Sequence, residues 1–186
     1  MGKIILASSS PRRADILKKM KLDFEIVPSL YAERHDKTDF SYKFIEKLAY
    51  NKALSVARKH REDALVIGAD TIVVIDNHIL GKPKDYDDAC KMLKKLSGRT
   101  HFVVTAIAVI NSRDLSYQIK SDTTYVTFEN LTDEQISDYI NKFKPYDKAG
   151  AYGIQELPPG FLRKVSGAPD NVIGLPSRLL REMLYK

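Results

Sequence analysis

The stretch Ala64–Ile75 constrains the fold of this chain more than any other. It reads Ala-Leu-Val-Ile-Gly-Ala-Asp-Thr-Ile-Val-Val-Ile, an apolar and largely β-branched run that is typical of a buried strand. Asp70 stands in the middle of this run, and a carboxylate is costly to bury unless it is paired, hydrogen-bonded or bound to a metal. The alternative is a surface turn between two short strands, with Asp70 in water.

The composition is that of an ordinary globular protein. Of the 186 residues, 44% are hydrophobic and 29% are charged, which allows one large domain or two small lobes that share a cleft. The apolar start is too short for a signal peptide, and no apolar run approaches the length of a membrane span. The single cysteine, Cys90, excludes an internal disulfide and favours a reducing compartment. We therefore expect a cytoplasmic protein that does not contact a membrane.

The net charge of +6 indicates an anionic partner. Nucleic acid is the general candidate for such a partner. However, the 30 Lys and Arg residues are scattered among 24 acidic residues, and no basic run carries interleaved aromatic residues. A few cations gathered in a cleft would bind a small phosphate equally well, so charge alone does not decide between the two partners.

Strand and helix patterns alternate along the first half of the chain, which predicts a mixed α/β fold. Ser10 is expected to cap a first amphipathic helix that begins at Pro11, and Ser41 a second helix. Either Asp85 or Asp87 is expected to cap the third helix. Thr132 begins a capping box with Gln135.

Later segments predict further strands and a final helix. Residues 101–110 and 116–128 are expected to pair as a hairpin, and residues 161–165 to form another short strand. We expect a turn at residues 167–171 and a terminal helix that opens at Pro176.

The segment Ser-Ser-Ser-Pro-Arg-Arg at residues 8–13 has the character of an anion cradle. It combines a serine-rich loop, a helix N-terminus and the guanidinium groups of Arg12 and Arg13. The first turn is the unfavourable end of a helix for cations, so their position favours a phosphate ligand. The alternative is that both arginines are solvated and that Asp15 offsets one of them.

Two lysines extend this pattern. Lys52 falls on the apolar stripe of the helix after Ser41, where it either reaches the rim or points into a cleft and meets a phosphate. Lys82 stands in a Gly-Lys-Pro break, which holds its backbone extended. The four histidines show no metal-ligand spacing, and the sequence has no phosphate-loop, dinucleotide-binding or serine-hydrolase motif.

Six segments in order resemble the Maf family of nucleoside triphosphate pyrophosphatases. They are Ser-Ser-Ser-Pro-Arg-Arg at 8–13, Gly-Ala-Asp-Thr at 68–71, Gly-Lys-Pro at 81–83, Leu-Ser-Gly-Arg-Thr-His at 96–101 with Thr-Ala at 105–106, Asp-Lys-Ala-Gly-Ala-Tyr-Gly-Ile-Gln at 147–155 and Asn-Val-Ile-Gly-Leu-Pro at 171–176. The resemblance covers residues 1–186 as a single Maf-like domain. It implies an elongated mixed sheet flanked by helices, two lobes around a cleft as in inosine triphosphatase-like proteins, and a homodimer.

The resemblance also implies an activity and a set of site residues. The activity is hydrolysis of a nucleoside triphosphate to the monophosphate and pyrophosphate with a divalent cation, Mg²⁺ or Mn²⁺. Arg12, Thr71 and Gln155 resemble the branch that prefers dTTP and UTP. Asp70 resembles the proton acceptor, and Glu33 a cleft acid that helps Asp70 to hold the metal. The residues that resemble phosphate-facing positions are Ser8, Arg12, Arg13, Lys52 and Lys82.

Two departures from the family pattern bear on the substrate. Ser9 replaces a common glycine in the cradle, and the acidic, proline-rich residues 156–159 follow the expected base pocket. The second departure leaves the choice among dTTP, UTP and modified pyrimidine nucleotides open.

The residue chemistry agrees with hydrolysis. Attack of water at the α-phosphorus builds charge on phosphoryl oxygens, which a divalent cation and fixed cations would stabilise. Asp70 either takes the proton of the water or holds a metal-bound water, and both roles stay open. The Gln155 amide matches the N–H and carbonyl of a pyrimidine ring.

The alternative function is a regulatory protein in cell division that binds nucleotides or nucleic acid without significant catalysis. A nucleic-acid binder would lose affinity steeply with salt. We expect a nucleoside triphosphate ligand and no stable nucleic-acid complex.

Overall fold

The computed structural model describes residues 2–31, 39–60 and 62–185, and it has a mixed α/β architecture. The strands are β1 (Lys3–Leu6), β2 (Glu25–Ile26), β3 (Ala64–Ile75), β4 (His78–Leu80), β5 (Thr100–Asn111), β6 (Tyr117–Phe128) and β7 (Leu162–Ser166). The helices are α1 (Pro11–Lys19), α2 (Tyr42–Ala57), α3 (Tyr86–Leu96), α4 (Asp133–Phe143), α5 (Pro169–Ile173) and α6 (Ser177–Leu184), with short 3-10 turns η1 (Ala149–Ala151) and η2 (Ile154–Glu156).

The described strands form one seven-stranded sheet in the order β2-β1-β3-β5-β6-β7, with β4 paired to the end of β3. β1 is parallel to β2 and β3, and the other pairs are antiparallel. Residues 65–74 of β3 pair with β5 in unbroken register, and Asp70 is 5% exposed. The predicted buried strand is therefore confirmed, and the alternative of a surface turn at Asp70 is excluded.

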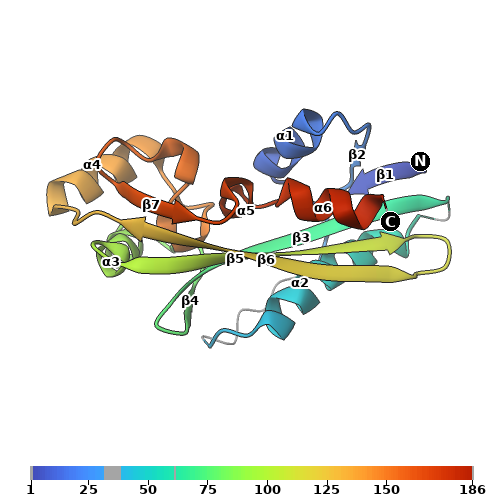
Figure 1. Ribbon diagram of the computed structural model, residues 1–186, viewed down its shortest axis with the longest axis horizontal. Helices are drawn as coiled ribbons and strands as arrows, with labels where there is room; N and C mark the ends of the chain where they lie inside the picture. The colour runs from blue at the N-terminus through green and yellow to red at the C-terminus, as the bar shows by residue number, and fades with distance from the viewer. Residues whose placement is uncertain (1, 32–38, 61, 186) are drawn as a thin grey trace.

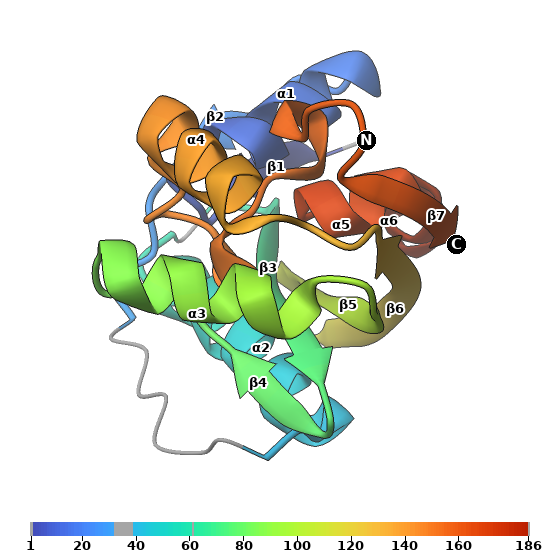
Figure 2. The same ribbon diagram turned by 90° about the vertical axis from the view of Figure 1, so that its left-hand side faces the viewer.

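Helices cover both faces of this elongated sheet, as the sequence predicted (Figure 1). The apolar side of α2 packs on one face, against β3 and β5. The opposite face is covered by α1 and α6 at one end of the sheet and by α3, α4 and η1 at the other. Figure 2 looks at the end of the molecule that carries α3 and α4. The two separate cores on this face define two lobes, and β3 runs through both.

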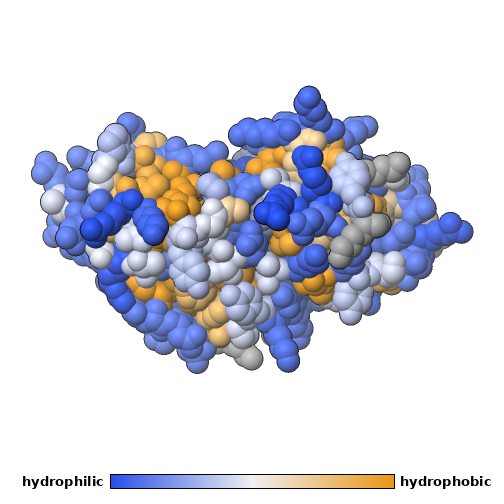
Figure 3. Space-filling model, in the orientation of Figure 1, coloured by the Kyte–Doolittle hydropathy of each residue, from blue (hydrophilic) through white to orange (hydrophobic). Residues whose placement is uncertain are grey.

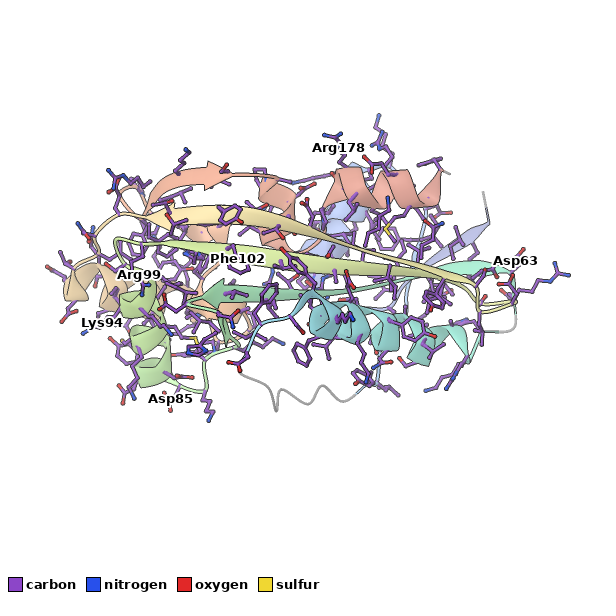
Figure 4. The ribbon with its side chains drawn as sticks, turned by 60° about the horizontal axis from the view of Figure 1, so that its bottom comes forward. Asp63, Asp85, Lys94, Arg99, Phe102 and Arg178 are labelled. Atoms are coloured by element: carbon purple, nitrogen blue, oxygen red, sulfur yellow. The ribbon has the colours of Figure 1, made fainter. Side chains whose placement is uncertain are left out.

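Capping residues account for where three of the six described α-helices begin. Ser41 Oγ accepts a hydrogen bond from the Phe44 N–H at 3.3 Å, and Asp85 caps α3, at whose start Figure 4 shows it. Thr132 and Gln135 form the predicted capping box. Among the described helices, none is long and apolar enough to cross a membrane.

One local prediction was confirmed only in part, and another was wrong. Ser10 occupies the N-cap position of α1, but its side chain makes no capping hydrogen bond, and its own N–H donates to Ser8 Oγ at 3.2 Å. Residues 167–171 are not simply a turn, because α5 begins at Pro169. This five-residue helix is too short to be stable by itself, and buried contacts of Asn171 hold it against the sheet.

Candidate active site

A gap in strand pairing along one edge of β3 creates the site. β1 pairs with residues 64–67 and β4 with residues 73–75, so in the described structure residues 68–72 have a neighbouring strand only on the β5 side. A cleft of about 650 Å³ lies at this edge, between the start of α1, the η1–η2 segment and the segment after α5. Figure 3 shows the surface notched between the part that holds α4 and the part that holds α1.

The cleft is strongly cationic. Among the described residues that line it, six carry positive charge and two carry negative charge. The cations are Arg12, Arg13, Lys52, Lys82, Lys84 and Lys148, and the acids are Asp70 and Asp147. Cations that share a concave surface focus a positive potential, so the cleft suits an anionic ligand with several charges.

Lys52 and Asp70 form a buried ion pair at the cleft. Lys52 is 9% exposed and Asp70 is 5% exposed, and Lys52 Nζ donates a hydrogen bond to Asp70 Oδ1. Of the two outcomes that the sequence left open, Lys52 thus takes the inward one. The other oxygen, Asp70 Oδ2, is buried and has no hydrogen-bond partner among the described residues.

Gly68 explains how α2 comes close enough to form this pair. A Cβ atom at Gly68 would lie 2.5 Å from the carbonyl oxygen of Ala49 and 2.6 Å from the backbone nitrogen of Ala53, both in α2. Gly68 and Asp70 are two residues apart in a strand, so they point to the same face of the sheet. The missing side chain at Gly68 therefore lets α2 bring Lys52 over Asp70.

Arg13 is held by three separate segments of the chain. Its Nη1 donates to Ser8 Oγ at 3.2 Å, and the same Ser8 oxygen accepts the Ser10 N–H. Its Nη2 donates to Thr71 Oγ1 at 3.2 Å, and its Nε donates to the Gly174 carbonyl at 2.9 Å. The loop before α1, the strand β3 and the segment after α5 therefore set the plane of this guanidinium together.

Arg12 spans the cleft to the opposite lobe. Its Nη1 donates to Asp147 Oδ2 at 2.7 Å, and the buried Lys148 donates to Asp147 Oδ1 at 2.9 Å. Lys148 Nζ also lies 3.2 Å from Glu156 Oε2. Partial burial by itself would raise the pKa of Asp147, but the hydrogen bonds from Arg12 and Lys148 outweigh it and lower the pKa to about 2. Asp147 is therefore negatively charged at neutral pH, where it pairs with Arg12.

The wall behind the cleft contains a neutral histidine. His101 Nε2 lies 2.7 Å from the hydroxyl of Tyr152, which lines the cleft, and His101 itself is 2% exposed. Burial lowers the pKa of His101 to about 4, and burial likewise raises the pKa of Tyr152. Both side chains are therefore uncharged at neutral pH.

The structure brings together every predicted site residue that it describes. Lys82 follows β4 and lines the cleft, and Gln155 in η2 does so with an exposed side chain. Gln155 also borders a smaller hollow that it shares with Arg12. The predicted metal ligand Glu33 lies outside the described residues.

Three charged lining residues were missed by the sequence reasoning, namely Lys84, Asp147 and Lys148. The last two lie in a segment that carries the family resemblance. Asp147 and Lys148 begin the loop at residues 147–155, whose lack of apolar periodicity suggested only a connection. The signal that could have found them was the adjacent pair of opposite charges in a loop that contains two glycines.

The residues that the structure describes offer few protein ligands for a divalent cation. They contain no group of three or more His, Cys, Asp or Glu side chains that could hold a metal. Asp70 Oδ2, however, is a carboxylate oxygen that lacks a partner. Mg²⁺ commonly uses only one or two protein carboxylates and takes its other ligands from water and substrate phosphates. This donor set therefore fits such an ion.

Fold and site together define a mixed α/β protein with a cleft for a polyanionic ligand. Residues 3–186 match the family described as Maf-like protein, so the chain belongs to the Maf family. The chain is 45% identical over 184 residues to the dTTP/UTP pyrophosphatase of Thermoanaerobacter pseudethanolicus. The matched region covers 99% of this chain and 96% of that protein. The chain is 46% identical over 187 residues to the dTTP/UTP pyrophosphatase of Ruminiclostridium cellulolyticum, covering 100% and 96%.

Among solved structures, a HAM1 protein from Coxiella burnetii superimposes with a TM-score of 0.53 and 16% identity. The match covers 99% of this chain and 98% of that one. At this identity the likeness shows a shared fold, and the predicted fold class is confirmed.

Proposed function

We propose that this protein is a nucleoside triphosphate pyrophosphatase that hydrolyses dTTP and UTP to the monophosphate and pyrophosphate. The observation that carries the proposal is the buried carboxylate of Asp70. Among the described residues, one of its oxygens has no hydrogen-bond partner, and six cations line the same cleft. Relatives that match over almost their whole length are named for this activity. The cleft charge suits a triphosphate, and the carboxylate suits activation of water.

Asp70 accepts the proton of the attacking water in this proposal. The hydrogen bond from Lys52 to Asp70 Oδ1 fixes the carboxylate plane and leaves Oδ2 for the water. The proton moves to Oδ2 as the water oxygen bonds to the α-phosphorus, and the bond to the bridging oxygen of pyrophosphate breaks. No covalent enzyme intermediate is needed.

The cations stabilise the charge that develops during this displacement. Contacts with the described residues Ser8, Thr71 and Gly174 already orient Arg13, so little reorganisation accompanies phosphate binding. Arg12 and Lys82 line the same cleft and complete the phosphate contacts. Asp70, with Glu33, would hold Mg²⁺ or Mn²⁺, and such an ion would neutralise further charge on the phosphoryl oxygens.

Gln155 selects the base in this proposal. Its amide offers an acceptor for the ring N–H of uracil or thymine and a donor for an adjacent carbonyl. A purine edge would leave one of these groups unpaired, which disfavours it. The side chain lies at the cleft beside Arg12, so the base would sit at the α1 end of the cleft.

The test is pyrophosphate release from a panel of purine and pyrimidine nucleoside triphosphates, with Mg²⁺, with Mn²⁺ and with a chelator. Asp70→Asn should lower turnover of dTTP and UTP by about 10³-fold, because the amide cannot accept the proton. Asp76→Asn is the matched control. It alters an exposed acid that pairs with Arg99 just beyond β3, and it should leave turnover unchanged.

Each outcome of this panel bears on one part of the proposal. Silence with every triphosphate would contradict the activity and favour a binding protein. A salt titration of nucleic-acid affinity would then test the regulatory alternative. Activity on purines alone would contradict the role of Gln155, and near-normal turnover in Asp70→Asn would contradict the role of Asp70.

A further inference from the structure

A chain of hydrogen-bonded hydroxyl groups runs from Arg13 into the core and has no part in the proposed chemistry. Thr71 and Thr105 stand directly opposite each other in the β3–β5 register, with their hydroxyl oxygens 2.9 Å apart. Thr105 Oγ1 in turn donates to the backbone carbonyl of Asn171 at 2.8 Å. Thr105 and Asn171 are fully buried.

The direction of these hydrogen bonds is determined by the carbonyl at one end. A carbonyl oxygen only accepts, so the single hydroxyl hydrogen of Thr105 lies between Thr105 Oγ1 and the Asn171 oxygen. Thr71 must therefore donate its own hydrogen to Thr105. The Thr71 oxygen also accepts a hydrogen bond from Arg13 Nη2 at 3.2 Å. Every step from Arg13 to Asn171 thus pairs a donor with an acceptor.

The side-chain amide of Asn171 anchors this chain. Its Oδ1 accepts the Thr105 N–H at 3.1 Å, and its Nδ2 donates to the Val103 carbonyl and to Thr124 Oγ1, both at 3.0 Å. Asn171 is therefore fixed by contacts with both β5 and β6, and buried polar groups held in this way do not rotate freely.

The same segment also reaches Arg13 directly. The Gly174 carbonyl accepts the Arg13 Nε–H at 2.9 Å. Gly174 has a φ of +122°, and a Cβ atom there would lie 3.3 Å from Thr71 Oγ1 and 3.6 Å from Arg13 Nε. Residues 171–174 thus hold the guanidinium both at Nε and, through two threonines, at Nη2.

We propose that Thr105 and Asn171 are positioning residues that fix the guanidinium of Arg13 toward the cleft. Neither is among the residues that line the cleft, so both act through Thr71 and Arg13. An arginine that is oriented before the ligand arrives loses less side-chain entropy on binding. The orientation itself stands on the contacts, and its effect on turnover rests on the proposed function.

Thr105→Val is the decisive variant because it removes only the hydroxyl. The Asn171 carbonyl keeps a second donor, the Gly174 N–H at 3.1 Å, so no buried acceptor is left unpaired. Thr71 loses its acceptor and becomes free to turn its hydroxyl away from its present direction. Thr105→Ser keeps a hydroxyl and should restore the native behaviour.

Thr100→Val is the matched control. Thr100 lies on the same strand, β5, and its hydroxyl is 2.8 Å from that of Thr127 across the β5–β6 pair. This second threonine pair is exposed and does not line the cleft. Thr100→Val therefore measures the effect of losing a cross-strand hydroxyl pair that does not position Arg13.

The first measurement is the rate of rotation of the Arg13 guanidinium about its Nε–Cζ bond, followed by NMR in the protein without ligand. The Arg13 signal is assigned by its loss in Arg13→Lys. Thr105→Val should speed the rotation about 10-fold, as expected when a group loses one of its fixed partners. Thr100→Val and Thr105→Ser should leave it unchanged. An unchanged rate in Thr105→Val would overturn the proposal.

The second measurement is a double-mutant cycle on pyrophosphate release. Thr105→Val should lower kcat/KM about 10-fold in the native background. In the Arg13→Ala background it should change kcat/KM by less than about twofold, because the residue acts through Arg13. Equal losses in both backgrounds would show a merely structural role and overturn the proposal. If the wild type is inactive but the rotation responds as expected, the proposed function fails and the positioning role stands.

Discussion

The two faces of β3 present different chemistry to the same cleft. On the face toward α2, Asp70 is buried as an ion pair with Lys52. On the opposite face, Thr71 belongs to a network of uncharged groups with Thr105 and Asn171, and the buried His101 farther along that face is also neutral. On β3 itself, the face toward α2, here called the charged face, buries an ion pair. The opposite face, here called the neutral face, buries hydrogen bonds between uncharged side chains.

This difference follows from the alternation of side chains in a strand and from the gap in pairing beside β3. Successive residues point to opposite faces, so Asp70 and Thr71 are neighbours in sequence that belong to different layers. The free edge lets both reach the cleft. The charged face supplies a group that can take a proton, whereas the neutral face orients a cation without competing for its charge.

The largest expected effect comes from breaking the charged face. Lys52→Met leaves Asp70 buried without its partner and should lower the free energy of unfolding by about 3–5 kcal/mol. Arg99→Met breaks the Arg99–Asp76 pair, in which both side chains are about half exposed, and should cost no more than about 1 kcal/mol. Arg99 lies beside α3 (Figure 4). Urea unfolding measures both.

A second substitution should restore the stability that Lys52→Met loses. Adding Asp70→Leu to Lys52→Met removes the remaining buried charge and should restore much of the lost stability. If Lys52→Met and Arg99→Met lowered the free energy of unfolding equally, the Lys52–Asp70 pair would not be desolvated.

The neutral face should be sensitive to acid. The pKa of His101 is about 6.5 in the unfolded protein, and burial lowers this pKa to about 4 in the folded protein. The protein is thus fully stabilised above pH 6.5, and its stability falls as the pH drops from 6.5 to 4. At about 1.4 kcal/mol per pKa unit, the loss approaches about 3 kcal/mol.

His101→Gln tests this assignment, because glutamine can still bond to Tyr152 but does not titrate. The free energy of unfolding measured from pH 7 to pH 4 should fall less steeply in this variant than in the wild type. Parallel curves would mean that another group causes the acid sensitivity.

The smallest effect is expected from a substitution that pushes α2 away from β3 without removing a charged group. Gly68→Ala places a Cβ atom 2.5 Å from the Ala49 carbonyl oxygen, so α2 must shift away from β3. Such overpacking should cost about 1–3 kcal/mol. Gly2→Ala, whose Cβ would meet only the Asp63 carbonyl oxygen at 3.6 Å, is the control. Thermal unfolding compares the two, and equal melting temperatures would contradict the close packing described at Gly68.

The sequence predicted features that depend on local patterns. The run around Asp70 indicated a buried strand because its apolar residues are continuous, and Ser41 and Thr132 marked helix starts through residue types that bond their own backbone. The placement of Asp70, Arg13 and the other described candidates in one cleft followed from the family resemblance, and the coordinates bring them together.

Contacts between distant segments could not be predicted in this way. The helical pattern around Lys52 could not show whether its side chain turns inward, because that depends on the absence of a side chain at Gly68 in the neighbouring strand. Helix α5 has five residues, which are too few to show a helical pattern of apolar residues in the sequence. The buried Asn171 holds this helix against the core. Lys148 is buried by its loop and by Glu156, which charge composition alone does not reveal.

The hydrogen bond between Arg13 and Gly174 joins residues 161 positions apart. During synthesis, Arg13 leaves the ribosome 161 residues before its partner does. Domains fold as units as the chain is made, and contacts of such long range form late. A nascent chain that ends before residue 171 therefore carries both arginines of the cradle without the segment that orients Arg13. The cleft acquires its full cationic geometry only after residue 174 has been synthesised and has folded onto Arg13.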